Sequence, residues 1–149
     1  MATLKNSVKN AVIKASGSTF FVTKKILATA VLTTASDLTT TATGRLAIMG
    51  ITLQTDATGL NSTSNAFTIT QNGTFGAATL VSQVTSGLGA NVSLSYGGGT
   101  HPTTGMQAVL DSGSKLQFQV ASAAATGLGY IQVTVEFKRV DENAQCTNA

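Results

Sequence analysis

The chain has 149 residues and a formal net charge of +3. This length suits one domain that buries about 68–70% of its unfolded surface, so its core needs no disulfide or metal. Charged residues make up 10% of the chain, against about 25% in typical soluble proteins. A surface so poor in ions disfavours a freely diffusing enzyme and suits a protein covered by its own copies or by a large assembly, because uncharged groups cost less to desolvate. Extracellular β-proteins share this composition.

Most of the basic residues lie at the N-terminus. Residues 1–25 hold five lysines and no acid, whereas the rest of the chain holds four basic and six acidic residues. Residues 1–17 are predicted to form an arm or short amphipathic helix, because apolar and basic positions recur there at helical spacing. These positions are Leu4, Lys5, Val8, Lys9, Val12 and Lys14. So short a helix orders only when bound, for instance to an acidic surface, and a frayed, solvated terminus is the alternative.

A short apolar run at residues 26–32 follows Lys24 and Lys25, as in an export signal. The run starts late and contains Thr29, which disfavours a cleaved signal. It is also far shorter than the roughly 18–20 apolar residues of a membrane-spanning helix, so no membrane partner is expected.

The next segments in chain order favour extended structure. Residues 18–34 are rich in β-branched and aromatic side chains and predict one long or two short strands. Residues 37–44 lack an apolar period and predict a loop. Residues 45–56 predict a strong strand whose apolar face changes side near Gly50, which indicates a β-bulge.

A hairpin signal follows at Asn72-Gly73, directly after a predicted strand at residues 66–71. Residues 77–88 fit either a helix or a strand, and the strand is preferred for their β-branched content. The later segments are a strand at 91–96, a glycine-rich loop at 97–105, a short strand at 107–110, a turn at 111–114, a strand at 115–121 and a small-residue loop at 122–129.

The clearest pattern is a strand at residues 129–141 with one dry and one wet face. The dry face comprises Ile131, Val133, Val135 and Phe137, and the wet face comprises Gln132, Thr134, Glu136 and Lys138. Short strands separated by turn residues predict an all-β fold, an antiparallel, jelly-roll-like β-sandwich of eight or nine strands. The sandwich is predicted to span residues 18–141, between the arm and a polar C-terminal tail at 142–149.

The sequence predicts no catalytic, metal or cofactor site. Nothing brings two of its six carboxylates together for acid/base catalysis. His101 is the only histidine and lies in the glycine-rich loop, and Cys146 is the only cysteine and is expected to be a free thiol in the tail. No small-molecule substrate is therefore predicted. Nucleic-acid binding is disfavoured because the aromatics nearest the basic arm, Phe20 and Phe21, look like core residues.

Three stretches carry a resemblance to a known family. They are residues 45–56 (RLAIMGITLQTD), 121–127 (ASAAATG) and 129–137 (GYIQVTVEF). From about residue 44 onward the chain resembles the small β-sandwich decoration, or cement, proteins of tailed-bacteriophage capsids. The resemblance implies a jelly-roll-like fold and homo-oligomers, typically trimers, that bind the major capsid protein on the outer surface of the virion and stabilise the shell without enzymatic activity.

Two site hypotheses follow for such a protein. The six arm positions from Leu4 to Lys14 would dock on the capsid, and the wet face of the last strand would contact neighbouring subunits or remain in solvent. The main alternative is a phage head-fibre, tail or receptor-contact module that binds host glycans, for which Tyr96 and Tyr130 are the plausible stacking residues. A third alternative is a hydrolase that uses His101 or Asp111.

Overall fold

The computed structural model describes residues 14–60, 66–73, 78–84, 88–97, 108–120 and 129–149. Within these ranges the chain forms nine strands and one short 3-10 helix. In chain order they are β1 Thr19–Leu27, the 3-10 helix η1 Ala28–Ala30, β2 Ser36–Asp37, β3 Leu46–Thr55, β4 Ala66–Asn72, β5 Ala78–Val84, β6 Ser93–Gly97, β7 Val109–Leu110, β8 Lys115–Val120 and β9 Tyr130–Arg139. Over the same residues, no helix has both the length and the apolar character needed to cross a membrane.

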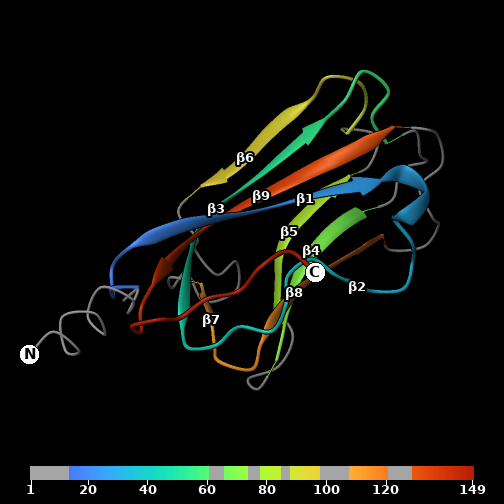
Figure 1. Cartoon of the computed structure of the whole chain (residues 1–149). Coiled ribbons are helices and arrows are strands. Elements are labelled where there is room, and N and C mark those ends of the chain that lie inside the picture. The colour runs from blue at the N-terminus through green and yellow to red at the C-terminus, as the bar shows by residue number, and fades with distance from the viewer. Residues whose placement is uncertain (1–13, 61–65, 74–77, 85–87, 98–107, 121–128) are drawn as a thin grey trace, which may run out of the picture.

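The strands form two antiparallel sheets that face each other (Figure 1). The larger sheet has the order β1-β9-β3-β6, with β7 pairing with the start of β3, and the smaller sheet has the order β2-β8-β4-β5. The chain passes from one sheet to the other at every step except β4 to β5 and β6 to β7, which is the strand order of a jelly roll. The prediction of an all-β, jelly-roll-like sandwich is confirmed.

Strand β9 lies at the centre of the larger sheet, where it pairs with β1 on one side and β3 on the other. Its apolar residues point toward the smaller sheet, and Ile131, Val133, Val135 and Phe137 are all fully buried. The predicted dry face is therefore confirmed. Because β9 has neighbours on both sides, every second residue can be buried between the sheets while the rest line the outward face.

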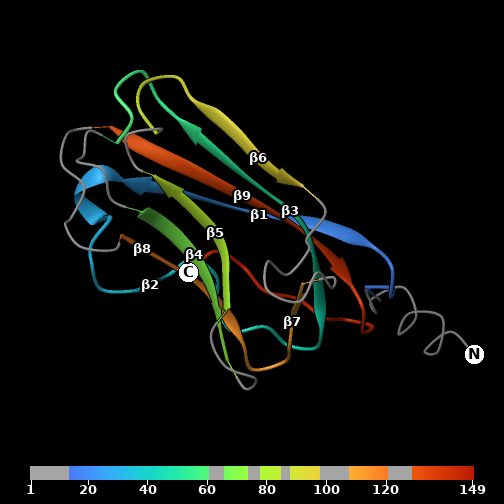
Figure 2. The same ribbon diagram turned by 180° about the vertical axis from the view of Figure 1, so that it is seen from behind.

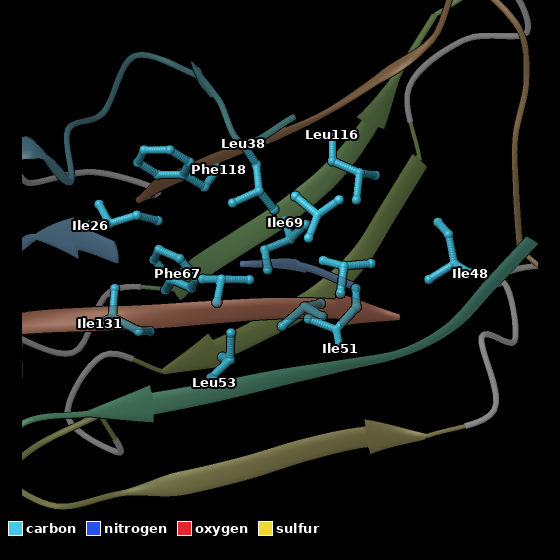
Figure 3. Close-up of a cluster of buried hydrophobic side chains, with 14 of the residues drawn as sticks. Ile26, Leu38, Ile48, Ile51, Leu53, Phe67, Ile69, Leu116, Phe118 and Ile131 are labelled. Atoms are coloured by element: carbon cyan, nitrogen blue, oxygen red, sulfur yellow. The ribbon is translucent and has the colours of Figure 1, made fainter. Parts of the chain in front are cut away.

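The core fills the space between the two sheets and draws side chains from both (Figure 3). Phe67 and Ile69 of β4 and Leu116 of β8 face Ile51 and Leu53 of β3, and all five are buried. Because the apolar set alternates along each of these strands, a one-residue change of register would turn it to the outside. The hydrophobic pattern therefore selects the strand register.

Two local predictions in the middle of the chain are confirmed. β3 carries an irregularity where Ile48 pairs with Phe137 and Gly50 pairs with Glu136, so that Met49 is the extra residue of a bulge. Residues Ala78–Val84 form a strand, β5, which pairs with β4 as a hairpin at the edge of the smaller sheet (Figure 2).

Two predictions near the N-terminus are corrected. Asp37, expected in a loop, belongs to the short strand β2 because it pairs with Gln117 of β8. Phe21, expected in the core, has 65% of its surface exposed, whereas Phe20 packs against the core and stacks on Phe137 at 5.4 Å. Adjacent residues of a strand point to opposite faces, so only one of the two phenylalanines can be inside.

Replacing Val135 by aspartate should unfold the domain. The side chain is fully buried between Val22 and Ile51, its partners on the two neighbouring strands, and an unpaired buried charge costs at least about 4 kcal/mol, a large part of a typical domain's stability. Thermal melting followed by circular dichroism would show this loss. Thr134→Asp, one residue away on the outward face, is the matched control and should melt cooperatively; a cooperative melt of Val135→Asp would show that the core is misassigned.

Candidate interaction surfaces

Three carboxylates of the described chain are engaged by other groups of the fold. In that part of the chain no group of three or more His, Cys, Asp or Glu side chains could hold a metal ion. Asp37 forms an ion pair with Lys115 at 2.8 Å, and Asp141 forms one with Arg45 at 2.9 Å. Asp56 instead accepts the backbone N–H groups of residues 58 and 59, at 3.0 and 2.6 Å. These carboxylates stabilise strands and turns, and His101 lies outside the described residues.

Their partners lower the pKa of all three carboxyl groups. The Lys115 ammonium and then the Gln117 amide hold the pKa of Asp37 below its usual value. The Arg45 guanidinium does the same for the pKa of Asp141, and the backbone N–H of Gly59 does so for the pKa of Asp56. The groups that lower these pKa values bind the charged form of each carboxyl group.

The predicted subunit-contact residues all lie on the outward face of β9. Gln132, Thr134 and Glu136 are partly exposed and Lys138 is exposed. Since β9 is central, these four side chains occupy the middle of the outward face of the larger sheet. The structure therefore groups them on one surface, and the sheet register extends that surface across the neighbouring strands.

The register aligns polar residues, all but one of them uncharged, in rows across four strands. One row is Thr23, Thr134, Thr52 and Ser95, and the next is Lys25, Gln132, Gln54 and Ser93. We call this surface, together with the exposed Phe21 at its edge, the hydroxyl face. Lys138 also lines a hollow of about 440 Å³ beside Met49 and Val140 at one end of it.

The hydroxyl face and the outward face of the smaller sheet differ in the hydrogen bonds that their polar side chains make within the protein. On the smaller sheet Asn72 donates to Gln117 at 2.9 Å, and Gln117 donates to Asp37 at 2.7 Å. Along the two rows of the hydroxyl face, the side-chain hydrogen bond between described residues joins Thr23 and Thr134, at 3.1 Å. The other hydroxyl and amide side chains of these rows have no hydrogen-bond partner among the described residues.

Most of the predicted docking arm lies outside the described residues, namely Leu4, Lys5, Val8, Lys9 and Val12. Lys14 is described, and it is held against the body: its N–H donates to Asn143 Oδ1 at 3.0 Å, its C=O accepts from the N–H of Asn143 at 2.8 Å, and its ammonium donates to the Gln145 side chain.

The C-terminal residues, predicted to be a polar tail, pack against the body. Ala144 and Cys146 are buried, and Thr43 and Gln145 exchange backbone hydrogen bonds at 2.9 Å. Arg139 fixes the start of this segment through a 2.9 Å hydrogen bond from Nε to the C=O of Ala144. Sequence reasoning missed this because the segment is short and mostly polar; the alternation of Ala144 and Cys146 was the available signal.

Between this segment and β1 lies a groove of about 360 Å³, which we call the edge groove. Its lining residues are Lys14, Phe20, Phe21, Val22, Thr23, Arg139, Gln145, Cys146, Thr147 and Asn148. The Arg139 guanidinium lies 4.3 Å from the centre of the Phe20 ring at this site. Two cationic side chains and no carboxylate therefore line the groove.

No family model matches the chain, and no curated protein matches it either. Among solved structures, a chain of the cyanophage Pam1 capsid asymmetric unit aligns with 14% identity and a TM-score of 0.44, over 88% of this chain and 95% of that chain. The infectious bursal disease virus VP2 subviral particle aligns with 13% identity and a TM-score of 0.15, over 80% of this chain and 41% of that chain.

Acid should destabilise the fold through its paired carboxylates. Asp37 and Asp141 have lowered pKa values in the folded chain, so protonation favours the unfolded chain; their contribution is complete above about pH 4 and is lost as the pH falls further. Asp141→Asn should lower the melting temperature at pH 7, and its curve should converge with that of the unaltered protein below about pH 3. Glu142→Gln, which removes an exposed carboxylate next to it, should behave like the unaltered protein. Parallel melting curves of Asp141→Asn and the unaltered protein across pH 2–7 would contradict the assignment.

The thiol of Cys146 should react slowly while the C-terminal segment is packed. Burial raises its pKa to about 11 and leaves 6% of the residue exposed, so both the thiolate fraction and access are small near pH 8. We expect labelling by Ellman's reagent to be at least about a hundredfold slower in the native protein than in guanidinium chloride. Ala149→Cys in a Cys146→Ser background is the exposed control and should react at once. Equal rates for the two thiols would show that the segment is not packed.

Proposed function

We propose that this chain is a non-enzymatic structural protein of a bacteriophage virion. It binds the outer surface of the capsid as a homo-oligomer, a trimer by its resemblance to decoration proteins, and stabilises the shell formed by the major capsid protein. The observation that carries the proposal is the hydroxyl face, a surface built on four paired strands whose central rows consist mostly of hydroxyl and amide side chains.

Several features of the hydroxyl face suit contact between subunits. Hydroxyl and amide groups lose less hydration energy on burial than ions do, and Phe21 is 65% exposed at its edge. Exposed aromatic side chains often anchor protein interfaces. Gly50 lies in register with Glu136 on this face, so β3 presents no side chain at that position and a second copy can approach its backbone there.

The glycan-binding alternative is weakened by the position of its two candidate tyrosines. The Tyr96 hydroxyl donates to Gln83 Oε1 at 2.7 Å, and burial raises the pKa of this phenol. The Lys25 ammonium lies 3.9 Å from the centre of the Tyr130 ring. The Tyr96 ring is partly buried against the core, and the Lys25 ammonium occupies one face of the Tyr130 ring, so both rings are less available for sugar stacking.

The proposal predicts that the hydroxyl face holds the oligomer together. Thr134→Arg should place a charge and bulk at the middle of the contact and weaken association by about 2 kcal/mol or more, roughly thirtyfold. Native mass spectrometry and sedimentation velocity would follow the loss of the oligomer. Thr68→Arg, on the outward face of the smaller sheet, is the matched control and should remain oligomeric.

The capsid role is tested by co-sedimentation with capsids of candidate host phages, with and without residues 1–13. Removing this segment keeps the hydrogen bonds of Lys14 intact and should weaken capsid binding without lowering the melting temperature. Unchanged binding would remove the docking role of the arm. A protein that is monomeric, and that sediments with none of the capsids, would overturn the proposed function.

A further inference from the structure

The outer edge of β1 is open. β1 pairs with β9 on one side and with no described strand on the other. In an antiparallel pair, every second residue directs its backbone N–H and C=O toward the partner strand. The backbone N–H of Arg139 donates to the C=O of Ser18 at 2.8 Å, which shows that Ser18 is one of these residues. Even-numbered residues of β1 therefore face β9. Phe21 and Thr23 direct N–H and C=O groups to the open side, where they bond to no described residue.

The C-terminal segment presents a second open edge across the groove. Gln145 and Thr147 make backbone hydrogen bonds with residues 40–43 at 2.8 to 2.9 Å. The intervening Cys146 must direct its own N–H and C=O the other way, toward β1. Among the described residues, neither group has a hydrogen-bond partner.

Lysine side chains join the two segments that border the edge groove. Lys14 donates to the side chain of Gln145 at one end, and Lys24 donates to the C=O of Ala149 at 2.7 Å near the other. Lys14 precedes Lys24 in the sequence, just as Gln145 precedes Ala149. β1 and the C-terminal segment therefore run in the same direction on the two sides of the groove. An extended chain between them could form hydrogen bonds with both, which is the geometry of strand addition.

We propose that the edge groove binds an extended, acidic segment of a partner polypeptide, which adds to β1 as a further strand. The charges select this partner, because Lys14 and Arg139 line the groove without any carboxylate and Lys25 extends the positive charge along β1. Unpaired edges are otherwise sites of uncontrolled association.

The chain's own N-terminal segment does not suit this place. Residues 1–13 carry Lys5 and Lys9 and no acid, so their charge is the same as that of the groove. The turn before β1, closed by a 3.2 Å hydrogen bond from Ser18 to Ala15, also directs Lys14 to Asn143 rather than to β1.

The probe is a nine-residue synthetic peptide, matching the length of β1, in which valine alternates with threonine and aspartate. In a nuclear magnetic resonance titration, the amide signals of Phe21, Thr23 and Cys146 should shift and their hydrogen exchange should slow. The same peptide with lysine in place of aspartate should bind about tenfold more weakly. Absence of these shifts, or equal binding of the two peptides, would overturn the proposal.

Two substitutions separate the backbone from the side chain at the groove. Thr23→Pro removes one open N–H, leaves the ladder with β9 intact and is tolerated at a sheet edge, so peptide binding should fall about tenfold. Thr23→Val keeps the N–H and should bind as the unaltered protein does.

A failure of Thr23→Pro to fold and a loss of its homo-oligomer each have their own interpretation. If Thr23→Pro does not fold, Lys14→Glu provides the test: it should weaken binding of the aspartate peptide and strengthen binding of the lysine peptide, and no change in either would overturn the proposal. If Thr23→Pro folds but breaks up a homo-oligomer that Thr23→Val keeps, the occupant is a second copy and the proposal fails. Neither result depends on capsid binding, so the proposed function is tested separately.

Discussion

The pairing of β9 with both β1 and β3 is the interaction on which the rest of the molecule depends. It joins residues that are far apart in the sequence, since Val22 and Ile51 meet on either side of Val135. The buried side chains of β9 close the core from one side, and its polar side chains form the centre of the hydroxyl face on the other. A single strand therefore determines both the stability of the sandwich and the character of its widest surface.

The outward faces of the two sheets are similar in composition but differ in the hydrogen bonds that their side chains make within the protein. On the smaller sheet, Asn72, Gln117 and Asp37 bond to one another, so a partner would have to replace existing bonds. On the hydroxyl face, the side chains of Gln132 and Gln54 bond to no described residue, so a partner would replace only water. This difference in hydrogen bonds made within the protein, rather than a difference in charge, distinguishes the surface that we propose for subunit contact.

Periodicity predicts the parts of this fold in which burial alternates with position. The dry face of β9 and the bulge near Gly50 were visible for that reason. Segments held by backbone hydrogen bonds to distant residues were not visible: β2 has two residues, and the packing of Cys146 depends on residues 40–43. The edge groove combines β1 with residues 145–148, and a sequence does not show which backbone groups lack partners.

The late position of β9 has a consequence for synthesis. Until residues 130–139 leave the ribosome, β1 and β3 lack the strand that lies between them, and two apolar strands stay without a partner. Contacts of such high sequence separation form slowly, and unpaired strands in incomplete chains favour aggregation. Threonine, serine and glutamine occupy many of the outward positions of these strands, which limits that hazard, so the side chains that we propose for subunit contact also reduce the apolar surface of the unfinished chain.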